Sequence, residues 1–191
     1  WSQYLKIQEI LQRIQFLEAP LHRKRDDAAN RSNRLANIDK FYQWAKDNGV
    51  TYEGVKIKEF PGYDLGLQAT RDIKKEELMF TIPRRLLLSE EHLGSKSNFF
   101  KLSNLNLAFA LMLESLKPDS FWKPYIDLLP DRYATVLYYT VEEMAQLEGS
   151  NALSVALKQC RLIARLYATI YSMQDVPLQD FNDIFNYDLY R

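Results

Sequence analysis

Cysteine and histidine are nearly absent from this sequence, and their scarcity limits the chemistry that the chain can support. Cys160 is the single cysteine, and His22 and His92 are the two histidines. A lone cysteine cannot form a disulfide within the chain. Because Cys160 lies in a helical pattern, we expect a buried thiol in a reducing compartment rather than a nucleophile. No metal-ligand cluster can be assembled from these three residues, so the sequence predicts no metal site.

The chain also has no net charge and no long apolar run. Its 25 Lys and Arg residues balance 25 Asp and Glu residues, so no overall field attracts nucleic acid or an anionic membrane. The basic segment at 23–34 is interrupted by Asp26 and Asp27 and has no interleaved aromatic residue to stack on bases. The longest apolar run is far short of the about 18 residues that span a bilayer, and the first three residues do not resemble a signal peptide. We expect a soluble protein of the cytoplasm, with the nucleus as an additional compartment, that binds neither nucleic acid nor membranes.

Apolar and aromatic residues, in contrast, are plentiful. They make up 47% and 13% of the 191 residues, which is enough for the core of one domain, or of one domain with an appendage.

The stretch from Tyr52 to Glu91 carries an alternation of apolar and polar residues that is typical of strands. Three short strands are predicted, at 55–58, 65–70 and 78–82. A tight turn at 61–64 and a charged corner at 71–77 connect them. The pattern therefore predicts a small antiparallel meander with one apolar face, and we expect hydrophobic surface to be exposed on that side.

Helical patterns precede this stretch. An apolar stripe from Tyr4 to Leu17 predicts a helix that Pro20 ends, and this helix either docks on the domain or binds a partner. A second helix is predicted between a cap at Asn37 and a left-handed stop at 48–49.

Helical patterns also fill the chain after Pro83. Seven residues mark helix ends in this region: Ser89, Ser103, Pro118, Thr140, Glu143, Gly149 and Asn186. Thr140 and Glu143 have the spacing of a capping box, and the longest helix is predicted from Ala152 for about five turns. The predicted fold class is α+β, with an N-terminal helical segment at 1–51, the meander at 52–90 and an all-helical region at 91–191.

The amino-acid sequence of the meander is more specific than its periodicity. GLQATRDIKKEEL followed by IPRRLLLS resembles the opening of a SET domain, the fold of many S-adenosylmethionine-dependent protein methyltransferases. LAFALMLESLKPDSFWKPYIDLLP is similar to the helical insertion of the branch typified by the Rubisco large-subunit lysine methyltransferase, which includes the animal actin-histidine methyltransferases. The resemblance runs from about Tyr4 to Arg191. It implies that 52–90 is the N-terminal part of a SET domain and that 91–191 is its insertion.

The resemblance also implies which residues contact the cofactor, S-adenosylmethionine. Arg34 matches an arginine that holds the methionine carboxylate, and Tyr63, Asp64 and Leu65 occupy cofactor-contacting positions in a glycine-bearing turn. Asp64 replaces the first glycine of that turn, although aspartate tolerates the left-handed backbone region. Its carboxylate attracts the ammonium or sulfonium of the cofactor, or its bulk obstructs the site. The residues by themselves are also compatible with a surface arginine and a plain hairpin turn.

The asparagine-histidine and tyrosine-glycine motifs that complete the pocket in this family do not occur in the sequence. We therefore expect an N-terminal portion of the enzyme with an incomplete SET core and no catalytic residue. The resemblance implies methyl transfer to a side-chain nitrogen without a metal, with actin histidine as the substrate and actin as the partner. Two alternatives stay open, namely a lysine methyltransferase of the same branch and a non-catalytic binding module whose insertion grips a partner.

Overall fold

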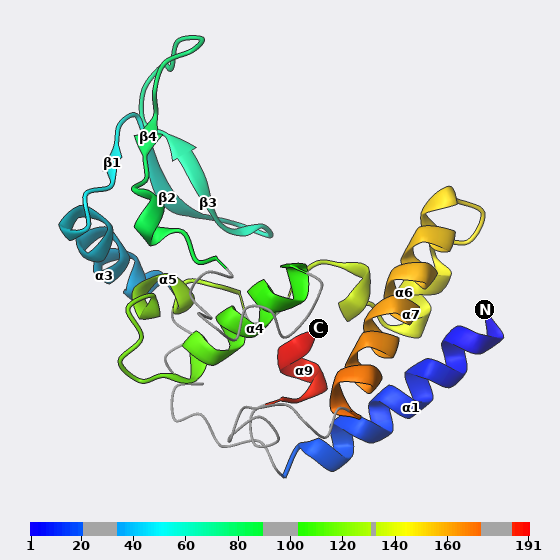
Figure 1. Ribbon diagram of the computed structural model, residues 1–191. Helices are drawn as coiled ribbons and strands as arrows, with labels where there is room; N and C mark the ends of the chain where they lie inside the picture. Colours follow the sequence, from blue (N-terminus) through cyan, green and yellow to red (C-terminus); the bar gives the residue numbers. More distant parts are fainter. Residues whose placement is uncertain (21–33, 90–102, 131–132, 173–184) are drawn as a thin grey trace. The chain divides into compact units, whose positions relative to one another are not determined.

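The computed structural model describes residues 1–20, 34–89, 103–130, 133–172 and 185–191 (Figure 1). The chain divides into two compact units, one formed by Trp1–Asp26 with Pro130–Arg191 and the other by Asp27–Leu129. Helices are combined with two small antiparallel sheets, which confirms the predicted α+β class. The domain boundaries predicted after residues 51 and 90 stay predictions.

The second unit is built on a β-hairpin. Strand β2 (Val55–Phe60) pairs antiparallel with β3 (Asp64–Ala69), with Val55 opposite Ala69 and Phe60 opposite Asp64. The first two predicted strands and their turn are therefore confirmed. Pairing through the last residue of β2 places Asp64 directly beside the turn.

The predicted meander is wrong in the pairing of its third strand. Strand β4 (Phe80–Thr81) pairs with β1 (Thr51–Tyr52) and not with β3, so the described part of the unit contains two two-stranded sheets. Gly54, at a φ of 72°, bends the chain between β1 and β2. Arg71 closes the corner after β3 by donating to Glu77, and this closure returns the chain to β1. An alternating pattern indicates a strand but does not state its partner, because it reports only the side-chain period.

Helix α3 (Arg34–Asp47) leads into these sheets. Its predicted stop is confirmed by Gly49, which has a φ of 84°. Its predicted start is wrong, because the helix already includes Arg34 and Asn37 lies inside it, buried, rather than at its cap. The side chain of Tyr42 fixes the helix to the hairpin, since its hydroxyl accepts a 2.6 Å hydrogen bond from the Ile57 N–H.

The other described elements of the second unit are the short 3-10 helix η1 (Arg84–Leu86) and the helices α4 (Ser103–Leu116) and α5 (Lys123–Ile126). The helix predicted from Ser103 is confirmed, whereas the one predicted after Ser89 lies outside the described residues. Aromatic contacts join α3 to the two residues that precede α5: Trp44 packs edge-on against Phe121 at 5.6 Å, and Phe121 against Trp122 at 5.2 Å.

The first unit is helical in its described residues. It contains α1 (Ser2–Glu18), η3 (Val136–Tyr138), α6 (Val141–Ala145), α7 (Asn151–Tyr171) and α9 (Tyr187–Tyr190). The predicted capping box of α6 and the cap of α9 by Asn186 are confirmed. Helix α1 docks along α7 (Figure 1). Docking within the domain is one of the two roles predicted for this helix. None of the helices described has the length and apolar character of a membrane span.

Cys160 lies in the core of the first unit with Tyr4, Met144 and Ala156. Its side chain is buried, and burial raises the pKa of its thiol. A raised pKa lowers the fraction of thiolate, the reactive form, at neutral pH. The interpretation of Cys160 as a packing residue is therefore confirmed.

The buried tyrosines of the first unit predict a loss of stability in alkali. Burial raises the pKa of Tyr4 and of Tyr187 to about 12. An unfolded tyrosine has a pKa of about 10, so above that pH the unfolded chain releases protons that the folded unit keeps. Ionisation of these phenols therefore leaves the free energy of unfolding unchanged below about pH 10 and lowers it between about pH 10 and 12. The slope for each tyrosine stays below about 1.4 kcal/mol per pH unit, because solvent screens part of the charge.

Urea unfolding followed by circular dichroism at pH 8, 10 and 11 measures this slope. Tyr4→Phe should reduce the slope, whereas Tyr63→Phe, at a side chain 87% exposed, should leave it unchanged. An unfolding free energy that stays constant up to pH 11 would contradict the expectation.

Candidate functional site

The turn between β2 and β3, together with the first two residues of β3, holds three of the four residues predicted to contact a cofactor. Gly62 and Asp64 both have left-handed backbone conformations, with φ values of 80° and 62°. The N–H of Tyr63 donates a 2.9 Å hydrogen bond to the carbonyl of Phe60 and closes the turn. The prediction that aspartate is accommodated in the left-handed region at position 64 is therefore confirmed.

Gly66, the second glycine of this turn, is required by packing within the hairpin. A Cβ at this position would lie 3.1 Å from two carbon atoms of the Phe60 ring. Such an approach is closer than ordinary van der Waals contact, so a larger residue would displace the ring. The absence of a side chain at Gly66 thus has a local explanation that does not need a ligand.

Arg34 reaches the same turn from the first residue of α3. Its guanidinium Nη1 forms an ion pair with Oδ2 of Asp64. On its other side, Nε donates a 2.8 Å hydrogen bond to the carbonyl oxygen of Leu128, just after α5. The structure therefore brings together two of the predicted residues, Arg34 and Asp64, which are 30 positions apart in the chain.

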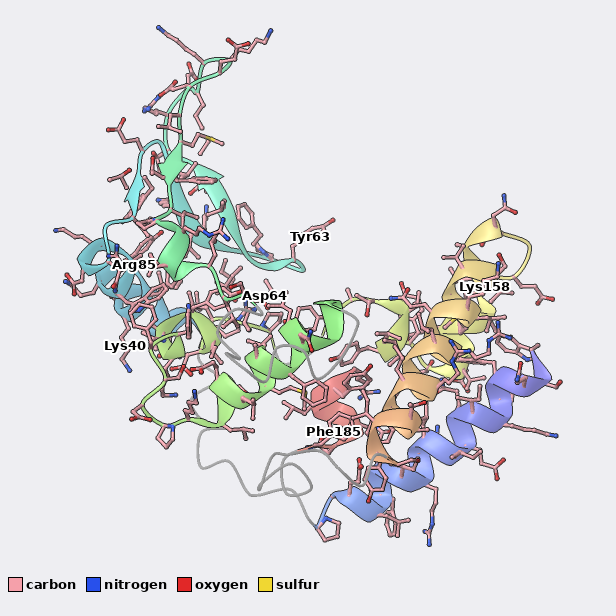
Figure 2. All side chains as sticks on the ribbon, viewed as in Figure 1. Lys40, Tyr63, Asp64, Arg85, Lys158 and Phe185 are labelled. Atoms are coloured by element: carbon pink, nitrogen blue, oxygen red, sulfur yellow. The ribbon has the colours of Figure 1, made fainter. Side chains whose placement is uncertain are left out.

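The other two predicted residues are placed differently. Tyr63 is 87% exposed, and Figure 2 shows it at the tip of the hairpin with its side chain directed away from the strands. Leu65 is half-buried, and its N–H donates a 2.8 Å hydrogen bond to Oδ1 of Asp64. Their cofactor contacts stay predictions. Leu128 was not predicted for the site, since it contributes only a backbone oxygen and no sequence pattern signals that role.

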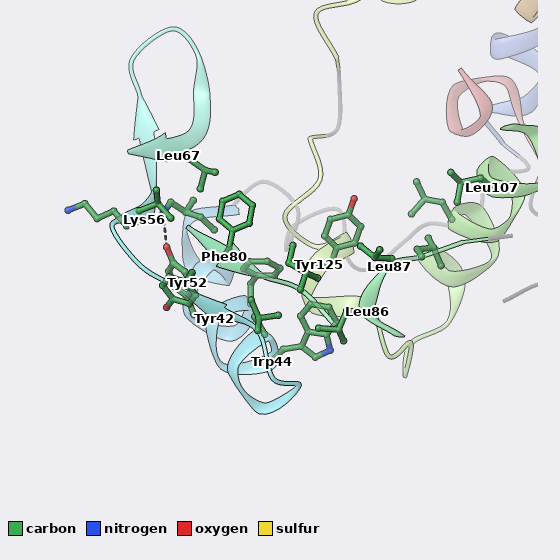
Figure 3. Close-up of a pocket in the computed structure, with 18 residues that line it drawn as sticks. Tyr42, Trp44, Tyr52, Lys56, Leu67, Phe80, Leu86, Leu87, Leu107 and Tyr125 are labelled. Carbon is green, nitrogen blue, oxygen red and sulfur yellow. Dashed lines mark hydrogen bonds between the residues drawn. The ribbon is translucent and has the colours of Figure 1, made fainter. Parts of the chain in front are cut away.

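Beside the hairpin lies a largely apolar hollow of about 500 Å³ (Figure 3). Its lining comes from α3, the strands, η1, α4 and α5, and includes Trp44, Phe80, Leu86, Leu107 and Tyr125. Two further lining residues are open to solvent, with Leu67 61% and Ile82 48% exposed. The predicted exposure of hydrophobic surface in this part of the chain is confirmed.

The polar groups of the site form a paired cation and anion, without the donor set of a metal centre. Among the described residues there is no group of three or more His, Cys, Asp or Glu side chains arranged to hold a metal ion. An Arg and an Asp side by side can bind a ligand that carries both charges, because the guanidinium donates to carboxylates and the carboxylate accepts from ammonium groups.

Known proteins resemble this chain both in sequence and in fold. The actin-histidine N-methyltransferase of Drosophila melanogaster is 45% identical over 179 residues, which are 90% of this chain and 33% of that protein. The chain is a homologue of part of this enzyme. The human actin-histidine N-methyltransferase is 33% identical over 207 aligned residues, covering 100% of this chain and 34% of that protein. No protein-family model matches the sequence.

Solved structures establish the fold independently. Rubisco LSMT bound to sinefungin and monomethyllysine superposes with a TM-score of 0.71 at 22% identity, over 81% of this chain and 38% of that one. Rubisco LSMT bound to AdoMet gives a TM-score of 0.68 at 21% identity, with 81% and 38% covered. The fold is therefore that of part of a SET-domain methyltransferase, and the resemblance seen in the sequence is confirmed. The chain spans about a third of the length of the curated relatives it matches.

Proposed function

We propose that this chain is the N-terminal, cofactor-binding portion of a protein methyltransferase that uses S-adenosylmethionine to methylate a histidine of actin. The observation that carries the proposal is the 45% identity to the Drosophila actin-histidine N-methyltransferase over 90% of the chain. That identity covers both the hairpin with its turn and the helical region beyond it. Actin is the proposed partner, and the cytoplasm, with the nucleus as an additional compartment, the proposed location.

Arg34 and Asp64 carry charges that complement the amino-acid end of this cofactor. S-adenosylmethionine supplies a methyl group on a sulfonium and carries an α-carboxylate and an α-ammonium group at its other end. The guanidinium of Arg34 is held at the turn by Leu128 and has further N–H groups to donate to a carboxylate. The left-handed backbone at Asp64 keeps a carboxylate on the same edge of the hairpin.

A second candidate function is lysine methylation. It is favoured by the structural likeness to Rubisco LSMT, which was solved with monomethyllysine. The two substrates pose different chemical problems, because an imidazole nitrogen is largely neutral near pH 7 whereas a lysine must first lose its proton. We favour histidine because the sequence identity to the histidine enzyme of Drosophila is about twice that to the lysine enzyme. A degenerate binding module, the third alternative, would bind actin without transferring a methyl group.

The proposal is tested with a longer protein, of the relatives' length, that carries this sequence. Incubated with S-adenosylmethionine and unmethylated actin, it should add one mass increment of a methyl group to a histidine-containing peptide, as read by mass spectrometry. The 191-residue chain alone should transfer none, because the two family motifs that complete the pocket are absent from it. It should also bind the cofactor more weakly than a Kd of about 1 μM.

Three results would change the assignment. Methylation of a lysine by the longer protein would replace histidine by lysine as the target. Binding of actin without methyl transfer would favour the binding module. Methyl transfer by the 191-residue chain would contradict the division of the site between this portion and the remainder.

A further inference from the structure

The ion pair between Arg34 and Asp64 is held from both sides by the backbone. The Arg34 side chain is 17% exposed and is anchored through Nε to Leu128. The Asp64 side chain is 58% exposed and is anchored through Oδ1 to the N–H of Leu65. Because each head group has its own anchor, the two charges stay at the turn even when a ligand separates them.

Both head groups keep unused hydrogen-bonding capacity. A guanidinium has five N–H groups and a carboxylate has about four lone-pair sites. Among the described residues, Arg34 uses one N–H on Leu128 and one on Asp64, and Asp64 accepts from Arg34 and from Leu65. A ligand can therefore add contacts to both groups without breaking either anchor.

We propose that Asp64 binds the α-ammonium group of the cofactor while Arg34 binds its α-carboxylate, so that the pair selects a zwitterionic amino-acid head group. This inference rests on the function proposed above and assigns Asp64 a role in specificity. An isolated arginine attracts any anion, but the Asp64 carboxylate already neutralises this one. A simple anion must compete with Asp64 for the guanidinium, whereas a zwitterion gives Asp64 a new cation in exchange.

The opposite role for Asp64 is obstruction. In that case the Asp64 carboxylate occupies the position on Arg34 that the carboxylate of the ligand needs. Removing the Asp64 carboxylate should then strengthen ligand binding. The two roles predict opposite signs for the same substitution, so a single variant separates them.

The test uses L-methionine, which has both charges, and 3-(methylthio)propionate, which lacks the ammonium group. Each is titrated into the ¹⁵N-labelled 191-residue chain, and the side-chain Nε–H signal of Arg34 and the backbone N–H signal of Leu65 are followed by NMR. We expect methionine to bind about 5-fold to 10-fold more tightly than 3-(methylthio)propionate, as an added charge-assisted hydrogen bond implies. Asp64→Asn should abolish most of this preference.

Two further variants make the result specific. Asp64→Gly keeps the left-handed turn, because glycine adopts that conformation freely, and it should lose the same preference. Glu59→Gln removes one negative charge from the same hairpin at an exposed position opposite Leu65 and should leave the preference unchanged.

Tighter methionine binding by either Asp64 variant would overturn the proposal in favour of obstruction. Equal affinities for the two ligands, or no shift at either signal up to about 50 mM methionine, would overturn it as well, since even a weak specific site is occupied at that concentration. None of these readouts involves methyl transfer. A longer protein that fails to methylate actin would therefore refute the proposed function and leave the zwitterion site standing.

Discussion

Replacing Glu18 by alanine is expected to lower the free energy of unfolding of the first unit by about 2 to 6 kcal/mol. Glu18 is the last residue of α1, and its side chain is buried. Its carboxyl group accepts a hydrogen bond from the hydroxyl of Tyr167 on α7 and a 3.0 Å hydrogen bond from the N–H of Tyr187 on α9. Alanine leaves both donors buried without this acceptor, and each unsatisfied donor costs about 1 to 3 kcal/mol.

The position of Glu18 strengthens this expectation. A carboxyl group at the C-terminus of a helix faces the negative end of the helix dipole, which disfavours it. The network with Tyr167 and Tyr187 must therefore outweigh that effect. It is a buried polar link between α1 and the two helices α7 and α9, beside the exposed 2.6 Å hydrogen bond from Gln15 to Asp188, so its loss should loosen the docking of α1.

Urea denaturation of Glu18→Ala, with hydrogen exchange at the α1 amides, measures the effect. Glu18→Gln should cost about 1 kcal/mol or less. The amide oxygen of glutamine can accept from the N–H of Tyr187, and its NH₂ group can donate to the hydroxyl oxygen of Tyr167. Tyr4→Phe is the matched control, because it also removes a buried polar group. No hydrogen-bond partner is found for the Tyr4 hydroxyl among the described residues. This variant should therefore be neutral or stabilising. A loss below about 1 kcal/mol for Glu18→Ala would refute the role of the network.

Replacing Trp122 by alanine should destabilise the second unit by about 3 to 5 kcal/mol. The Trp122 side chain is buried, and its indole N–H donates a 3.1 Å hydrogen bond to the carbonyl of Leu86. It also precedes α5 directly as its N-cap residue. Truncation removes a large apolar volume and leaves the Leu86 carbonyl without this donor.

The same substitution should weaken the candidate site. Helix α5 leads to Leu128, whose carbonyl anchors Arg34. When α5 loses its packing, this carbonyl should become mobile and Arg34 should lose one of its two fixed contacts. We expect hydrogen exchange of the α5 amides to increase, and the NMR preference for methionine over 3-(methylthio)propionate to fall.

Two variants serve as controls for Trp122→Ala in urea denaturation. Trp122→Phe keeps an aromatic ring without the N–H and should cost an intermediate amount. Phe121→Ala removes the neighbouring ring, which is 43% exposed, and should cost clearly less than Trp122→Ala. A smaller loss for Trp122→Ala than for Phe121→Ala would show that the packing at α5 depends on the exposed ring instead.

The turn at Asp64 illustrates how far sequence reasoning reaches into the site. The resemblance placed Asp64 at a glycine position of the turn, and aspartate was expected to tolerate the left-handed region there. The φ of 62° confirms that this residue is accommodated. The resemblance pointed to Arg34 as well. It did not reveal that Arg34 and Asp64 are partners of each other, and this contact is what supports a paired site for the two charges of an amino-acid head group.

The sequence by itself determined the features that arise within a few residues of the chain. The capping box at Thr140, the stop at Gly49 and the turn of the β2–β3 hairpin follow from local hydrogen bonds and backbone preferences. Only the tertiary structure decided the pairing of β1 with β4, the link between Glu18 and Tyr167 across 149 positions, and the anchoring of Arg34 on Leu128 across 94. Such contacts depend on which distant segments pack together, and side-chain periodicity carries no record of that choice.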